Sequence, residues 1–213
     1  MEETFQPHRY LLFLRFILIN LVGASLLASA YMQGWMDGFF VDVTFELSAV
    51  IGAAFLLGLA SCGNKIWRAS IELNDINSGA PATGSRAGKY LETIYGGDVE
   101  SRTMAAATLR LKLSGSAAAI RQVANGLVFL GLIGTVIGFI IALSGVDPSR
   151  ATEVDNVARM IATLISGMSV AMYTTLAGSV LYVWLSVNHR ILANGSVSLI
   201  TAIIELGERR ERL

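Results

Sequence analysis

Three threonines are the polar side chains of most chemical interest in two long apolar stretches. Thr135 lies within residues 122–146, and Thr174 and Thr175 lie within residues 160–188. Neither stretch contains an Asp, Glu, His or Lys side chain. A proton relay through hydrocarbon normally needs a titratable group, so this chain alone does not provide one at mid-depth. Hydroxyl groups could instead donate hydrogen bonds to a carboxylate from a second chain and accept them from water.

Each hydroxyl also has a purely structural interpretation. Threonine in a membrane helix commonly donates to a carbonyl one turn earlier in its own helix, and spacing alone favours that role for Thr135. Thr175 is open to the same two interpretations. Thr174 lies about 100° round the helix from Thr175, so the two side chains should not face the same way. Thr135, Thr175 and Thr174 are together the candidate ion-pathway residues.

Small residues recur at spacings of three or four along both apolar stretches, so they share one face of each helix. Such a face lets a neighbouring helix approach closely in lipid. Packing within one subunit explains both faces, and the functional extension is that adjoining faces line a central opening filled by partner helices. The residues expected to pack are Gly131, Gly134, Gly138, Gly167, Ala171 and Gly178.

The composition is that of an integral membrane protein. Hydrophobic residues make up 54% of the chain and charged residues 15%, whereas a soluble domain carries about 25% charged residues. Lys+Arg and Asp+Glu number 16 each, so bulk charge argues neither for nor against nucleic acid, and no such partner is expected. Strand-like alternation is absent. The sequence therefore predicts an all-α, polytopic membrane protein with four transmembrane helices.

Hydropathy divides the chain into four parts. Helices three and four are expected to be long and to extend into the cytoplasm, because the sequence before the third apolar stretch contains few helix breakers. The predicted parts are an N-terminal transmembrane hairpin (1–62), a cytoplasmic helical region (63–121), a transmembrane pair (122–188) and a cytoplasmic C-terminal helix (189–213).

Basic residues predict the orientation of these spans. Residues 63–121 contain eight Lys and Arg, and the tail after residue 188 contains four. The first connection contains none, and only Arg150 and Arg159 lie near the second. The positive-inside rule then places both termini and the long interval in the cytoplasm.

Metal and disulfide chemistry find no support in the sequence. Cys62 is the only cysteine, so an intramolecular disulfide is impossible. His8 and His189 have no acidic or cysteine neighbours at ligand spacing. No metal site and no cofactor are expected.

Two segments carry a resemblance to a known family. Residues 131–138 read Gly-Leu-Ile-Gly-Thr-Val-Ile-Gly, similar to the Gly-Leu-x-Gly-Thr-Val-x-Gly segment of the proton channel family that includes MotA, TolQ and ExbB. Residues 167–178 end in Thr-Thr-Leu-Ala-Gly and resemble the Thr-x-x-Gly segment of the family's last membrane helix. The resemblance covers residues 104–190. Four spans match the stator-type MotA layout, whereas TolQ and ExbB are expected to have three.

This resemblance implies a partner and a task. It implies a homopentamer of this subunit around a dimer of a single-span chain similar to MotB, TolR or ExbD. The partner would supply the essential aspartate, the ion would be a proton, and ion flow would drive rotation of the ring in a bacterial inner membrane. It also favours a pore-facing role for Thr135 and Thr175. The cytoplasmic interval is shorter than that of the flagellar stator, so no rotor-contacting residues are carried over.

Other classes of protein remain open on the sequence. A self-sufficient small-solute transporter would require a polar or charged site within its own spans and internal repeats, and neither is visible. A membrane scaffold would use residues 191–213 as its working part. A membrane enzyme is disfavoured because no nucleophile–base pair or metal cluster is found.

Overall fold

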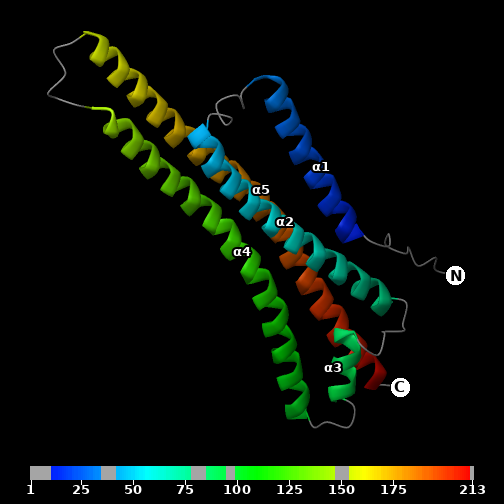
Figure 1. The fold of residues 1–213 in the computed structure, drawn as a ribbon. Helices are drawn as coiled ribbons and strands as arrows, with labels where there is room; N and C mark the ends of the chain where they lie inside the picture. Colours follow the sequence, from blue (N-terminus) through cyan, green and yellow to red (C-terminus); the bar gives the residue numbers. More distant parts are fainter. Residues whose placement is uncertain (1–10, 35–41, 78–84, 95–98, 147–153, 212–213) are drawn as a thin grey trace. The chain divides into compact units, whose positions relative to one another are not determined.

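The computed structural model describes residues 11–34, 42–77, 85–94, 99–146 and 154–211. These residues form five helices and no strand (Figure 1). The predicted all-α class is therefore confirmed. The helices are α1 (Leu11–Met32), α2 (Asp42–Asn77), α3 (Arg86–Ile94), α4 (Val99–Ser144) and α5 (Val154–Glu211).

Four of these helices, α1, α2, α4 and α5, are long and apolar enough to cross a membrane, as predicted. A crossing requires about 20 predominantly apolar residues, and the shortest of the four, α1, has 22. None of the α1 residues is buried against the rest of the chain. A mainly apolar helix without a buried residue is suited to lipid rather than water.

The helices continue well beyond their apolar stretches. α4 has 46 residues and includes the segment before residue 122 without a break. α5 has 58 residues and passes through residue 189, the predicted start of the C-terminal helical part, without a break. α2 likewise runs past Cys62 to Asn77. Hydropathy locates the end of an apolar stretch, whereas a helix ends where its backbone hydrogen bonding stops.

Contacts divide the chain into two compact units. Unit 1 comprises Met1–Val22, Leu59–Arg121 and Val187–Leu213. Unit 2 comprises Gly23–Gly58 and Gln122–Ser186. The helices α1, α2, α4 and α5 each contribute residues to both units.

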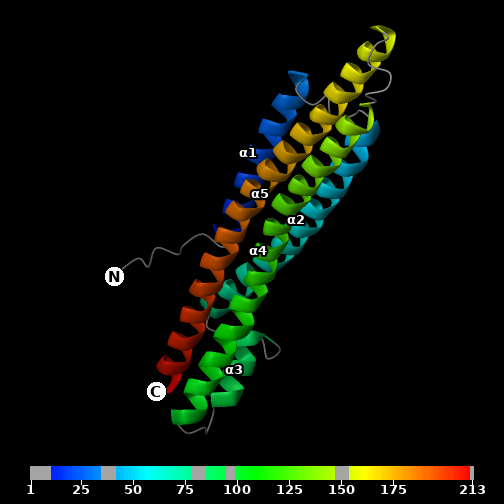
Figure 2. The same cartoon turned by 90° about the vertical axis from the view of Figure 1, so that its left-hand side faces the viewer.

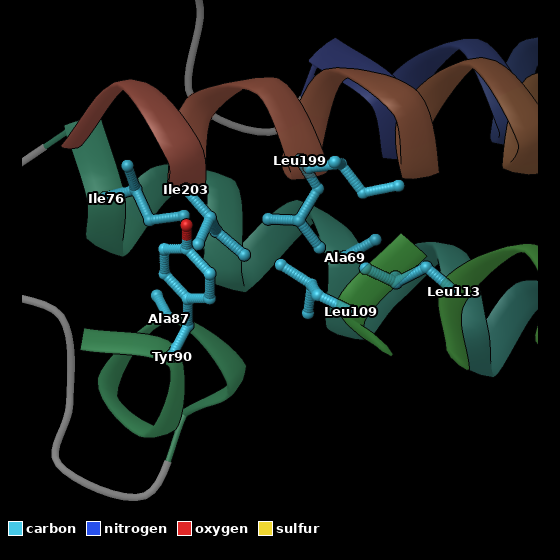
Figure 3. Close-up of a cluster of buried hydrophobic side chains, with 9 residues drawn as sticks. Ala69, Ile76, Ala87, Tyr90, Leu109, Leu113, Leu199 and Ile203 are labelled. Atoms are coloured by element: carbon cyan, nitrogen blue, oxygen red, sulfur yellow. The ribbon is translucent and has the colours of Figure 1, made fainter. Parts of the chain in front are cut away.

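A buried apolar cluster forms the core of unit 1 (Figure 3). Helices α2, α3, α4 and α5 all contribute to it. Their polar and charged residues lie on the remaining faces, so this end of each long helix is amphipathic by position rather than apolar all round. The cluster consists of Ala69, Ile76, Ala87, Tyr90, Leu109, Leu113, Leu199, Ile200 and Ile203.

The short helix α3 is held on this core by its apolar face and by two polar contacts. Ala87 and Tyr90 lie one turn apart on that face, and both are buried. The Ser85 hydroxyl accepts a hydrogen bond from the Gly88 amide (3.0 Å), which caps the helix N-terminus. Arg86 Nε lies 3.7 Å from Glu72 Oε1 of α2. The core thus orders a nine-residue helix that would be unstable alone.

Leu199→Ala should destabilise unit 1 by about 2–5 kcal/mol, because it leaves a cavity in this core. Leu199 is fully buried, whereas Val197 on the same helix is 62% exposed. Thermal unfolding of the purified chain in detergent would measure the effect, with Val197→Ala as the matched control. Equal melting temperatures for the two variants would show that the cluster is not a stabilising core.

In unit 2, α2 and α1 pack against the same part of α5, near the middle of that helix. A Cβ at Gly58 of α2 would lie 2.8 Å from a methyl group of Leu185 and 3.0 Å from one of Val123. The rings of Phe55 and Trp184 have centroids 5.2 Å apart. Gly23 of α1 also abuts the Trp184 ring. These contacts leave the early part of α5 to pack against α4.

Candidate functional site

Within unit 2, α4 and α5 run antiparallel and side by side, in backbone contact at their glycines (Figure 2). A Cβ built on Gly138 would lie 2.6 Å from the amide nitrogen of Ala171 and 2.6 Å from the carbonyl oxygen of Gly167. A Cβ on Gly178 would lie 2.6 Å from the carbonyl oxygen of Leu127. Cβ atoms do not approach backbone atoms this closely, so glycine is required at these positions. Such contacts are typical of helix association in lipid.

The contact contains all six of the small residues singled out in the sequence. A Cβ on Gly131 would lie 3.1 Å from the Thr174 carbonyl oxygen, and one on Gly134 would overlap the Thr174 side chain. Gly167 meets the backbone of Ala142. Because backbone lies against backbone here, the described part of the α4–α5 contact leaves no room for an ion between the two helices of one chain.

Thr174 lies inside this contact. Its side chain is fully buried. Its hydroxyl donates within its own helix, with the carbonyl oxygens of Val170 at 2.9 Å and Ala171 at 3.2 Å. Within one chain, the Thr174 hydroxyl therefore donates to α5 itself, while Oγ1 and Cβ of the same side chain lie against Gly134. Its role in an ion pathway stays a prediction.

Thr135 and Thr175 lie on one side of the α4–α5 pair. Gly134 of α4 contacts Thr174 of α5 directly. Thr135 follows Gly134 by one position, and Thr175 follows Thr174 by one position. One position along a helix corresponds to a rotation of about 100° about its axis. In an antiparallel pair of right-handed helices, the same rotation leads to the same side of the pair. Thr175 Oγ1 lies 3.5 Å from the Gly131 carbonyl oxygen. Thr135 is one turn further along α4, a rise of about 6 Å.

Both hydroxyls are hydrogen-bonded to backbone carbonyls. The Thr135 hydroxyl donates to the Leu132 carbonyl, and the Thr175 hydroxyl donates to the Ala171 carbonyl at 3.0 Å. Each hydroxyl oxygen keeps lone pairs that can accept a hydrogen bond from water or from a protonated carboxyl group. Rotation about Cβ–Oγ would let the same group donate to a carboxylate instead. The two threonines can therefore interact with either protonation state of a carboxyl group.

The surface around these hydroxyls is apolar and uncovered within the chain. Leu132 and Phe139 on α4 lie one turn before and after Thr135, and both are exposed. Met168 and Met172 precede Thr175 by two turns and one turn, and Met172 is 72% exposed. We call this surface the threonine face: Thr135, Thr175, Leu132, Phe139, Met168 and Met172. Spacing alone did not single out its four apolar members, because nothing in their residue type shows which side of α4 and α5 is left open.

Comparison with known proteins gives a family. Residues 99–204, about half of the chain, match the model of the MotA/TolQ/ExbB proton channel family. The match begins at the first residue of α4 and includes most of α5, and so contains the whole of the glycine contact and the threonine face. No curated protein and no solved structure gives a significant match to the chain. The family match and the two helix motifs agree, and the chain belongs to the MotA/TolQ/ExbB proton channel family.

Proposed function

We propose that this chain is the ring-forming subunit of a proton-driven motor of the stator type. Five copies would surround a dimer of a single-span partner similar to MotB, TolR or ExbD, and an aspartate of the partner would carry the proton. The observation that carries this proposal is the threonine face. It combines two hydroxyls with an exposed apolar surface. In the described residues, an ion cannot pass between α4 and α5 of one chain, because their backbones are in contact.

Residues 122–144 of α4 and 160–186 of α5 contain no charged side chain. A carboxylate that conducts protons through this region must then come from another chain. An apolar surface disfavours the charged form of that carboxyl group, and the two hydroxyls offset part of the cost by hydrogen bonding. The threonine face is thus suited to hold a partner carboxyl group that alternates between its charged and neutral forms.

The mechanism follows from this alternation. Protonation of the partner's aspartate would weaken its contact with Thr135 and Thr175 of one subunit, and deprotonation would remake the contact on the next subunit. One proton crossing 100 mV releases about 2.3 kcal/mol, enough to bias a rotation but not to unfold a packed unit. The glycine contact keeps α4 and α5 together, so these two helices of unit 2 would turn as one body.

The proposal includes an orientation. By the positive-inside rule, the basic residues of residues 63–121 and of the tail would lie in the cytoplasm of a bacterium together with both termini, and the subunit would lie in the inner membrane. The apolar core of unit 1 would then lie outside the lipid, where burying apolar side chains from water stabilises a fold. Membrane lipid would surround the exposed surface of α1.

Proton flux into liposomes tests the proposal. The chain reconstituted alone should conduct no more than protein-free liposomes under an imposed potential. The chain copurified with a single-span partner similar to MotB, TolR or ExbD should conduct, and changing the partner's membrane aspartate to asparagine should return the flux to background. Flux through the chain alone would favour a self-sufficient transporter and overturn the proposal.

A further inference from the structure

Two asparagines face each other between α1 and α5 in unit 1. Asn20 Nδ2 donates to Asn188 Oδ1 at 2.9 Å, and Asn188 Nδ2 donates back to Asn20 Oδ1 at 3.4 Å. Asn20 Nδ2 also lies 2.8 Å from the Phe16 carbonyl oxygen. Asn188 is fully buried. Reciprocal amide hydrogen bonds require both side chains to lie at one level of the two helices.

The rest of the α1 contact in unit 1 has no such directional requirement. Leu12 packs on Gly195 of α5. Phe13 packs edge-on against Trp67 of α2, with ring centroids 4.6 Å apart, and the Phe16 ring lies over Gly63. Apolar contacts fit by shape alone, and the close approach of Leu12 to Gly195 favours the observed register, to which the amide pair adds hydrogen bonds of fixed direction.

We propose that the Asn20–Asn188 amide pair sets the register of α1 against α5. A shift of one turn would separate the two amides, so both would lose these reciprocal hydrogen bonds. A single buried asparagine fixes the register of coiled coils in the same way, at some cost in stability. Interhelical hydrogen bonds in membrane proteins contribute little to stability on average, so the pair acts on specificity more than on stability.

The pair also has a consequence for the whole helix. Asn188 lies on the same continuous helix, α5, as Gly167, Thr174 and Thr175. No residue of α1 is buried. The amide pair adds a contact of fixed direction to the apolar contacts that hold α1 against α5.

Cysteine cross-linking tests the register directly. In a Cys62→Ala background, Leu12→Cys with Gly195→Cys reports the observed register, since a Cβ on Gly195 would lie 2.5 Å from Leu12 Cδ2. Leu12→Cys with Ile191→Cys reports a shift of one turn. With the asparagines present, the first pair should cross-link and the second should stay at background.

Asn20→Leu/Asn188→Leu should lower the yield of the first cross-link several-fold and raise that of the second above background. Asn64→Leu, on the exposed side of α2, is the matched control and should leave both yields unchanged. A double variant that keeps only the first cross-link would overturn the proposal. Loss of the folded chain would also overturn it, because two leucines leave no amide unpaired and the pair would then be a stability element.

Discussion

Gly138→Val is expected to prevent α4 and α5 of unit 2 from closing on each other. The first added carbon would lie 2.6 Å from two backbone atoms of α5, the Ala171 nitrogen and the Gly167 oxygen. Backbone atoms inside a helix cannot move aside independently, so the helices must separate. Overpacking of this kind costs about 3 kcal/mol or more. The melting temperature in detergent should fall by roughly 6–12 °C.

Gly126→Val is the matched control on the same helix. A Cβ at Gly126 meets nothing within 4 Å, so valine there should leave the melting temperature nearly unchanged. The comparison separates the close approach of α5 from the general effect of replacing a glycine in α4. Equal melting temperatures for the two variants would mean that α4 and α5 are not in backbone contact at Gly138.

The fold class and the number of spans could be predicted from the sequence because lipid imposes one simple requirement. A helix that crosses the membrane must be apolar over about 20 residues, and four stretches meet that condition. The ends of the helices could not be predicted in this way. α5 continues through Asn188 because Leu199 and Ile203 are packed in the core of unit 1, and this packing brings together segments far apart in the chain.

The candidate site was predictable in its residue types but not in its exposure. Helical spacing shows that Thr174 and Thr175 point in different directions, yet it cannot show which of them meets α4. The structure shows that Gly134 of α4 meets Thr174, which leaves Thr175 at the edge beside Gly131. The Asn20–Asn188 pair was missed for a related reason. A polar residue in each of two distant apolar helices signals a pair only when their packing is known.

Thr135→Val/Thr175→Val is expected to reduce proton flux through the assembled complex by about 10-fold to 100-fold. Valine keeps the shape of threonine and removes only the hydroxyl. A hydrogen bond contributes about 0.5–1.5 kcal/mol, more when one partner is charged, and 1.4 kcal/mol corresponds to a factor of ten in rate. The two hydroxyls lie on one side of the α4–α5 pair, so a partner carboxyl group can meet both. Removing both hydroxyls should therefore reduce the proton flux more than removing either one.

Thr163→Val is the control for this double variant. The Thr163 hydroxyl also bonds a carbonyl of its own helix, that of Arg159 at 3.1 Å, but its side chain packs against Gly145 in the α4–α5 contact. Like Thr135 and Thr175, Thr163 donates a hydrogen bond within its own helix, but it does not lie on the threonine face. The proton flux of the Thr163→Val complex should therefore stay close to that of the unmodified complex. Flux that is unchanged in the double variant would mean that both hydroxyls serve only their own helices. A loss confined to Thr174→Val would instead mean that α4 and α5 separate during conduction, because that side chain is reached only when their contact opens.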